Sequence, residues 1–341
     1  MNEANARVGR TILVTGGTGF LGRHLCQHLM ARGDRLVVLA GDARRARELF
    51  GAQVGAQVGA QVGAQVGAHV GARAQIVSRL DEIPNDASID AMINLAGAAV
   101  MRLPWTRARR EELLASRIEV TNDLVALIAR LEVRPRVLVS ASSVSYYGVR
   151  GDEEVTEAMR GQPIFQSHLC QAWELAAQAA GNHGVRVCRL RFGLVLGSDG
   201  GVLPVLVRPA RLGLRIVLGS GRQWMSWVHV EDAIRLVEFC IARDELAGGV
   251  NACAPTPVRQ RQFTALLAAR FGRAVTVVVP AEWLRSALGD LSQVLLEGQR
   301  VLPLQAACSG FVFRYPHVGL ALEQLLPAPH AERASAHVRT G

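Results

Sequence analysis

Seven residues near the N-terminus, Gly16-Gly17-Thr18-Gly19-Phe20-Leu21-Gly22, constrain the fold more than any other part of the chain. A short β-rich run at residues 11–14 precedes them, and residues 23–32 repeat apolar side chains at helical spacing. A glycine turn between a strand and a helix lets the backbone approach a pyrophosphate, which the N-terminal N–H groups of the helix stabilise. The sequence therefore predicts dinucleotide binding, with contacts from Gly16, Gly19, Phe20, Leu21 and Gly22.

The N-terminal half continues as short apolar runs that alternate with amphipathic segments. We expect strands at residues 35–39, 91–95, 136–139 and 185–190, and helices at 42–50 and about 107–131. Strands that alternate with helices indicate an α/β fold with a doubly wound parallel sheet covered on both faces. After about residue 198 the chain changes to Gly/Pro-punctuated loops and shorter helices, which predicts a smaller domain at the carboxyl edge of the sheet.

Residues 51–70 break this pattern with five copies of a four-residue unit, Gly-Ala-Gln-Val four times and then Gly-Ala-His-Val. A glycine at every fourth position costs a helix about 1 kcal/mol per copy relative to alanine. The unit is also too short for a solenoid repeat. We therefore expect a mobile, dispensable surface loop between the second helix and the next strand.

Composition excludes several classes of function. All 38 basic residues are arginine, so a P-loop lysine or a Schiff-base lysine is impossible. The net charge of +9 is spread along the chain and only 5% of residues are aromatic, which argues against nucleic-acid binding. The six cysteines form no C-x-x-C pair, so we expect no metal site. No apolar run reaches 18 residues, and we expect a cytoplasmic protein that does not bind a membrane.

Two further strand ends carry small residues. Asn94-Leu95-Ala96-Gly97 ends one predicted strand and Ser140-Ala141-Ser142 ends the next. The carboxyl ends of parallel strands line the ligand crevice of an open α/β sheet, although tight turns alone would also explain these residues. We expect cofactor contacts from Leu95, Ala96, Gly97, Ser140, Ala141 and Ser142.

Together these stretches resemble the epimerase-like group of atypical short-chain dehydrogenase/reductases. The resemblance runs from about residue 11 to 326 and also rests on Ser116-Arg117-Ile118, Tyr146-Tyr147-Gly148, Gly219–Trp224, Trp227-Val228-His229 and Leu296–Val301. It implies a Rossmann domain that binds NAD(P) over residues 10–197 and a C-terminal α/β substrate domain over 198–326, with 226–255 returning to the Rossmann domain. Residues 1–9 and 327–341 would be flexible termini. The family implies no established substrate. As partners we expect a small-molecule substrate of unknown identity and, in a homodimer, a second copy of the chain.

The orthodox superfamily uses a Tyr-x-x-x-Lys pair with an upstream serine, and this chain lacks the pair. By resemblance, Gln166 takes the tyrosine position, Cys170 the lysine position and Arg117 the position of an asparagine. If the chain is an enzyme, the candidate catalytic residues are Ser142, Cys170, Arg117 and Tyr146 or Tyr147. A cysteine near an arginine can have a lowered pKa, but Cys170 would equally serve as a buried packing residue.

Other residues complete the expected site. We expect Arg117, Arg191 and Gly193 to contact the cofactor. Trp224, Trp227 and His229 are candidates for the substrate pocket, with core packing as the alternative, and His168 is expected to be exposed on a different helix face.

Asp42 ends the second predicted strand, where a carboxylate can bind the ribose 2′-OH of NAD. Asp42 is equally suited to cap the following helix, and Arg44 or Arg45 could then bind a 2′-phosphate bidentately. We therefore expect NADP(H) in preference to NAD(H). Two functions remain open: an oxidoreductase or epimerase-like enzyme, and a non-catalytic NADP(H)-binding protein that senses redox state or regulates a partner.

Overall fold

The computed structural model describes residues 9–58, 74–100, 105–289 and 291–327, and its largest feature is a seven-stranded parallel sheet. The strand order is β13-β7-β5-β4-β1-β2-β3, with every neighbouring pair parallel. The strands are β1 (Thr11–Thr15), β2 (Arg35–Leu39), β3 (Ala74–Val77), β4 (Ala91–Asn94), β5 (Val137–Ser143), β7 (Arg186–Phe192) and β13 (Gly248–Ala252). This order is that of a Rossmann sheet, so the predicted α/β doubly wound fold is confirmed.

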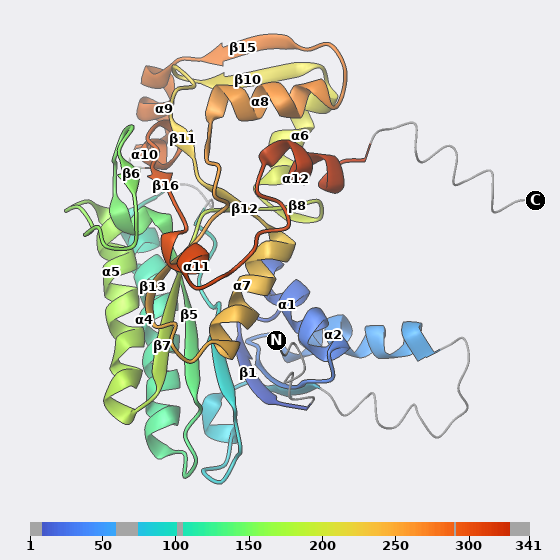
Figure 1. Cartoon of the computed structure of the whole chain (residues 1–341), viewed down its shortest axis with the longest axis vertical. Helices are drawn as coiled ribbons and strands as arrows, with labels where there is room; N and C mark the ends of the chain where they lie inside the picture. The colour runs from blue at the N-terminus through green and yellow to red at the C-terminus, as the bar shows by residue number, and fades with distance from the viewer. Residues whose placement is uncertain (1–8, 59–73, 101–104, 290, 328–341) are drawn as a thin grey trace, which may run out of the picture.

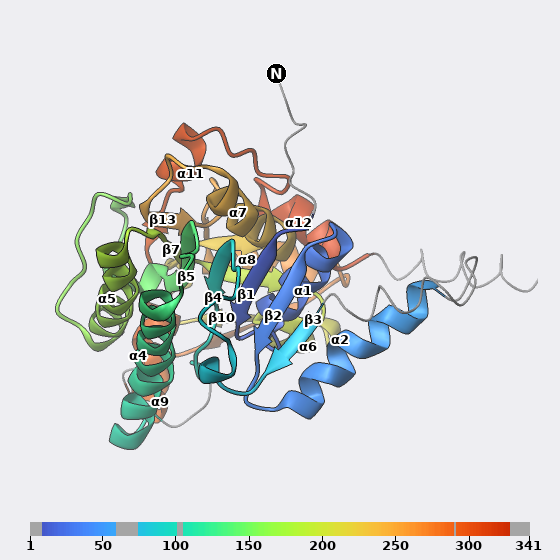
Figure 2. The same cartoon turned by 90° about the horizontal axis from the view of Figure 1, so that it is seen from below.

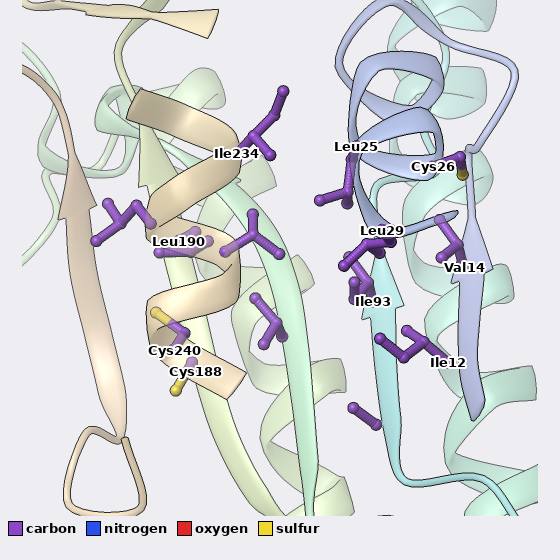
Figure 3. Packing of buried hydrophobic residues seen from close by; sticks show 14 of the residues in the cluster. Ile12, Val14, Leu25, Cys26, Leu29, Ile93, Cys188, Leu190, Ile234 and Cys240 are labelled. Atoms are coloured by element: carbon purple, nitrogen blue, oxygen red, sulfur yellow. The ribbon is translucent and has the colours of Figure 1, made fainter. Parts of the chain in front are cut away.

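Helices cover both faces of this sheet (Figure 2). One face packs against α1 (Phe20–Ala31), α2 (Ala43–Val58) and α7 (Val230–Ala242), and the other against α4 (Arg107–Arg130) and α5 (Phe165–Gln178). Figure 3 shows Leu29 of α1 against Ile93 of β4, and Cys240 of α7 beside Cys188 of β7. Because both faces are buried, the strands read as nearly continuous apolar runs rather than as alternating ones.

Part of the chain beyond residue 198 returns to this sheet. After α7, strand β13 pairs with the outer edge of β7, with Val250 opposite Leu190. The division of the chain into two domains near residue 198 remains a prediction.

Most of the elements after β7, apart from α7, α11 and β13, gather at the carboxyl end of the sheet, in the upper part of Figure 1. There β10 (Leu214–Leu218) pairs with β15 (Val275–Val279), and α6 (Leu203–Arg211), α8 (Gln260–Ala269) and α12 (Val318–Leu325) enclose a second apolar core. Shorter elements complete the described chain: η1 (Leu80–Glu82), η2 (Val144–Tyr147), β6 (Glu154–Val155), η3 (Ala179–His183), β8 (Leu194–Gly197), β9 (Gly200–Gly201), β11 (Trp224–Met225), β12 (Trp227–His229), β14 (Val258–Arg259), α9 (Ala281–Leu288), α10 (Leu291–Leu296), β16 (Arg300–Val301) and α11 (Leu304–Cys308).

The expectation of a loop from residue 51 is wrong for the first two repeat units, because α2 continues through Val58. A helix already formed over 43–50 extends by one residue for each new hydrogen bond, and this extension costs much less free energy than the nucleation of a new helix. Alanine and glutamine in each unit favour the helix and offset part of the glycine penalty. The rest of the repeat, residues 59–70, lies outside the described residues.

Within the part of the chain that the structure describes, no helix combines the length and the apolar character needed to cross a membrane.

Candidate functional site

The glycine turn joins β1 to α1 in a tight loop. Gly16 has φ of +70°, and a Cβ there would lie 2.6 Å from the backbone of Leu95 at the end of β4. The Gly19 N–H donates to the Gly16 carbonyl at 3.0 Å, and a Cβ on Gly22 would collide with the same carbonyl oxygen. Only glycine therefore allows α1 to begin so close to β1 and β4.

The beginning of α1 is suited to an anion. No side chain caps the helix at Gly19, and its first turn contains no acidic residue. The N–H groups of the first turn have no intrahelical partner and carry the positive end of the helix dipole. The described residues thus fit a dinucleotide, whose pyrophosphate the N–H groups of Phe20 and Leu21 would bind, and Leu95 lies against the turn at Gly16.

Asp42 lies at the start of α2, beyond the carboxyl end of β2. Its Oδ1 accepts a hydrogen bond from the Arg45 N–H at 2.9 Å, so the N-cap interpretation of Asp42 is confirmed. Arg44 and Arg45 are exposed in the first turn, and Arg44 pairs with Glu48 at 3.1 Å. The Asp42 carboxylate therefore accepts a hydrogen bond from the backbone at the position where NAD would need it for its ribose.

A hollow of about 580 Å³ opens beside this helix start, at the carboxyl ends of β2 and β3. Gly41, Ser78 and Arg79 line it together with residues of η1 and α4. Arg79 is exposed and pairs with Asp81, and we did not anticipate it from the sequence. Arg79 comes just after β3, and strand ends were expected to line the crevice. The strand itself was not predicted, because it directly follows the repeat.

A buried polar network fills the space behind the end of β5. Ser142 Oγ donates to Glu174 Oε1 at 2.7 Å, and Arg191 holds both oxygens of Glu174 through Nε and Nη2 at 2.8 and 2.9 Å. Arg191 Nη1 also donates to Tyr147 Oη at 2.8 Å, and Tyr147 donates to Asn251 Oδ1 at 2.6 Å. Burial raises the pKa of the Tyr147 phenol well above its ordinary value, and the arginine offsets this effect only in part.

Three of the predicted site residues belong to this buried network and do not line the cavity. Ser142 and Arg191 both bond Glu174, and Arg191 also bonds Tyr147. None of the three is among the lining residues of the cavity at the carboxyl ends of β5 and β7. Ser143 and Ser145 line the cavity in their place, and Ser143 Oγ accepts a hydrogen bond from the Ser145 N–H at 3.2 Å. Successive residues of a strand face opposite sides of a sheet, so Ser142 faces α5 and Ser143 does not. Alternation separates the two serines, but it does not tell which of them reaches the cavity.

This cavity at the carboxyl ends of β5 and β7 has a volume of about 320 Å³. The C-terminal elements β10, β11, α8 and α10 close it from the far side. Its wall is mainly apolar, and eleven lining residues bring polar groups to it: Arg117, Ser143, Ser145, Gln166, Cys170, Gln223, Ser226, Gln260, Thr264, Glu297 and Gln299. A concave, largely apolar site with few polar groups is typical of small-molecule binding.

Helix α5 brings Gln166 and Cys170 to this wall, one turn apart, while His168 between them is exposed as predicted. Burial raises the pKa of the Cys170 thiol to about 12, and the nearby Arg117 lowers it only slightly in comparison. The predicted reactive thiolate is therefore wrong, and Cys170 is protonated at neutral pH. Cys170 is buried, as the packing alternative expected, but it still lines the cavity.

Arg117 reaches the cavity from α4. Its Nη1 and Nη2 donate to the carbonyls of Leu113 and Ala98, each at 3.0 Å, and its guanidinium lies 5.1 Å from the ring centre of Trp173. A Cβ on Gly97 would lie 2.9 Å from Cζ of Arg117, so this glycine makes room for the guanidinium. Burial lowers the pKa of Arg117, but an arginine remains charged at physiological pH.

Only Trp224 of the three predicted pocket residues lines the cavity. Trp227 is fully buried in the second core, and its Nε1 donates to the Thr256 carbonyl at 3.1 Å. His229 caps α7 through Nδ1, contacts Gln324 through Nε2 and stacks on Tyr315 at 3.8 Å between ring centres. Core packing therefore describes Trp227 and His229, because β12 carries them into the interior.

The other predicted contacts lie at the strand ends as expected. Gly193 lines the cavity, where a Cβ would lie 2.5 Å from the Ser226 carbonyl oxygen. Ser140 is buried, and its Oγ accepts a hydrogen bond from Asn94 Nδ2 at 3.4 Å. The neighbouring Ala141 is also buried. Among the described residues, no group of three His, Cys, Asp or Glu side chains is arranged to hold a metal ion.

The family of the chain follows from its sequence matches. A family model described as the NAD dependent epimerase/dehydratase family matches residues 12–252, and a model of a domain of unknown function matches residues 279–325. The chain belongs to this epimerase family. Its glycine turn, strand ends and seven-stranded sheet all lie within the first match.

Named relatives of this epimerase-family protein extend over nearly its whole length. The epimerase family protein YfhF of Bacillus subtilis is 33% identical over 92% of this chain and 97% of its own length. The chloroplastic SDR39U1 homolog of Arabidopsis thaliana is 34% identical over 93% of this chain and 86% of its own. The crystal structure of human SDR39U1 with NADPH has a TM-score of 0.78 and 29% identity, covering 93% of this chain and 99% of that one. The family is thus NAD(P)-binding and of the atypical short-chain dehydrogenase/reductase type.

Proposed function

We propose that the chain is an NADP(H)-dependent oxidoreductase that acts on a carbonyl group of a small molecule held in the cavity. The observation that carries the proposal is the position of Gln166 and Cys170 on the cavity wall beside the end of β5. This wall lies at the carboxyl edge of the sheet, where the glycine turn also opens, and ligands of doubly wound sheets bind at this edge. A dinucleotide on the turn and a substrate in the cavity would then meet beside α5.

The chain's own residues would manage the proton. When bound, the cofactor supplies a hydride to the carbonyl carbon or accepts one from the corresponding alcohol. In the reducing direction the carbonyl oxygen becomes an alkoxide, a stronger base than a thiolate, and it takes the proton of Cys170. The positive charge of Arg117 stabilises the thiolate that forms, and water later returns the proton. Gln166 would orient the carbonyl oxygen through its amide N–H groups.

The preference for NADP(H) rests on the groups around the start of α2. The Asp42 carboxylate accepts from the Arg45 N–H, which leaves it less available to a ribose hydroxyl. Arg79 lines the hollow at the ends of β2 and β3, and Arg44 and Arg45 lie in the first turn of α2, shortly after its lining residue Gly41. These three guanidinium groups are the candidates to bind a 2′-phosphate. NADPH is also the cofactor in the structure of the human relative.

A second candidate is a non-catalytic NADP(H)-binding protein that reports redox state. The high pKa of Cys170 favours it, because the thiol is a weak acid and Gln166 has no titratable proton. In this case the cavity would hold a regulatory ligand rather than a substrate.

Turnover measurements distinguish the two candidates. The full chain, saturated with NADPH, is mixed with a panel of aldehydes and ketones, and NADPH consumption and product mass are followed. For an enzyme we expect Cys170→Ala to reduce turnover on any accepted compound by about 100-fold or more, with unchanged NADPH affinity. The matched control Cys308→Ala removes an exposed thiol and should have no effect. Tight NADPH binding without consumption of NADPH on any compound would favour the second candidate.

A further inference from the structure

Arg117 differs from the other buried arginines in its electrostatic partners. Three described arginines are almost fully buried, namely Arg109, Arg117 and Arg191, with exposed fractions of 8%, 7% and 4%. Arg109 pairs with Glu112 at 2.5 Å, and Arg191 pairs with Glu174 at 2.8 Å. Among the described residues, no carboxylate pairs with Arg117.

The hydrogen bonds of Arg117 leave part of its guanidinium free. Three bonds are present, to the carbonyls of Leu113 and Ala98 and to Ser116 Oγ at 3.5 Å. A guanidinium has five N–H donors, so at least two have no acceptor among the described residues. Nε, which Arg191 uses to hold its carboxylate, donates none of the three bonds in Arg117.

The groups that act electrostatically on Arg117 do not neutralise it. They are the thiol of Cys170 and the like charge of Arg109. Because burial keeps Cys170 protonated at neutral pH, the thiol contributes no negative charge in the resting protein. Removing a charge from water without a partner is costly, and buried charges in proteins are normally paired.

We infer that the cavity takes an organic acid, whose carboxylate pairs with Arg117. This inference rests on the proposed function in one respect, that the cavity is the substrate site. An arginine fork matches the two oxygens of a carboxylate, as Arg10 and Asp34 also illustrate in this chain at 3.1 and 2.8 Å. Trp105, Leu169 and Trp173 line the cavity with Arg117, so the rest of the acid should be apolar, and about 320 Å³ limits it to a compact molecule.

Binding of a matched acid and amide tests this inference. Tryptophan fluorescence of the NADPH-saturated full chain is titrated with 4-phenylbutanoate and with 4-phenylbutanamide, which have nearly the same shape. Trp105, Trp173 and Trp224 line the cavity and report on its occupation. We expect the acid to bind about tenfold more tightly than the amide, or better, as a charge-assisted bidentate contact allows.

Variants assign the preference to Arg117. Arg117→Met should abolish the preference for the acid, and Arg117→Lys, which keeps the charge but not the fork, should retain part of it. Arg107→Met is the matched control, because it removes a fully exposed arginine from the first turn of the same helix and should retain the whole preference. The comparison of acid and amide in the unmodified chain needs no variant to fold.

Several results would overturn the inference. These are equal binding of acid and amide, no binding of either, or an acid preference that survives in Arg117→Met while NADPH affinity falls, which would assign Arg117 to the cofactor. Failure of the proposed function is distinguishable from these. Acid binding without hydride transfer would leave this inference standing, whereas reduction of neutral carbonyls without an acid preference would leave only the proposed function.

Discussion

At the scale of single residues, burial decides what the polar groups of this site can do. Cys170 and Arg117 lie on the same cavity wall, yet burial keeps the thiol protonated and leaves the guanidinium charged. Asp42 also depends on its local partner, because its carboxylate accepts a hydrogen bond from the Arg45 N–H and so caps α2. Side-chain type alone therefore does not determine the role of a residue in this site.

The arginines at the start of α2 give a prediction on cofactor choice. We expect the double variant Arg44→Ala, Arg45→Ala to lose about tenfold in NADPH affinity and little in NADH affinity, because only the 2′-phosphate needs their charge. Paired titrations at equal salt measure both affinities. Tighter binding of NADH than of NADPH by the unmodified chain, or an unchanged NADPH affinity in the double variant, would refute the preference for NADP(H).

Single residues also decide which parts of the site can be predicted from the sequence. The glycine turn was predictable because its spacing has a strict steric reason, which Gly16 and Gly22 satisfy. The exchange of Ser142 for Ser143 on the cavity wall was not, because it depends on which face of β5 meets α5. The partner of Ser142, Glu174, lies 32 residues away in the sequence, and no local pattern reveals such a contact.

At the scale of elements, α2 shows a helix that persists into a glycine-rich repeat. We expect Gly51→Ala with Gly55→Ala to raise the free energy of unfolding by roughly 0.5–1 kcal/mol per position, because alanine is the better helix former. Urea unfolding followed by circular dichroism measures the change. Equal stability of the variant and the unmodified chain would mean that residues 51–58 are not helical in solution.

The beginning of α7 gives a prediction on pH. Burial lowers the pKa of His229 despite its contact with Gln324, so the folded protein resists protonation of this ring. An unfolded histidine titrates near pH 6.5, so the stability linked to His229 is present above that pH and falls as the pH drops below it. We expect His229→Asn, which can still cap the helix, to flatten the loss of stability between pH 6.5 and 5 by up to about 1.4 kcal/mol per pH unit.

Denaturant unfolding at several pH values measures this slope. The matched control His168→Asn removes an exposed imidazole and should leave the slope as it is in the unmodified chain. An equally steep slope in His229→Asn would assign the acid sensitivity to other groups.

At the scale of the whole molecule, the network around Glu174 joins β5, α5, β7 and β13. We expect Glu174→Gln to lower the free energy of unfolding by about 3–5 kcal/mol, because it leaves the charge of Arg191 buried without its carboxylate. The double variant Glu174→Leu, Arg191→Leu removes both charges and should be less destabilised than the sum of the single changes to leucine. Additive losses in urea unfolding would show that the pair does not act as a unit.

In the proposed function, a cofactor on the glycine turn would exchange hydride with a small molecule in the cavity. The most direct measurement loads the full chain with NADPH that carries deuterium at the transferred position of the nicotinamide ring. The loaded protein is mixed in a single turnover with a metabolite extract, and mass spectrometry searches for compounds that gain deuterium. We expect at least one compact metabolite to gain deuterium while the bound NADPH is oxidised in equal amount, and we expect Cys170→Ala to slow the transfer. NADPH that stays bound and unoxidised, with no metabolite labelled, would contradict the proposed function.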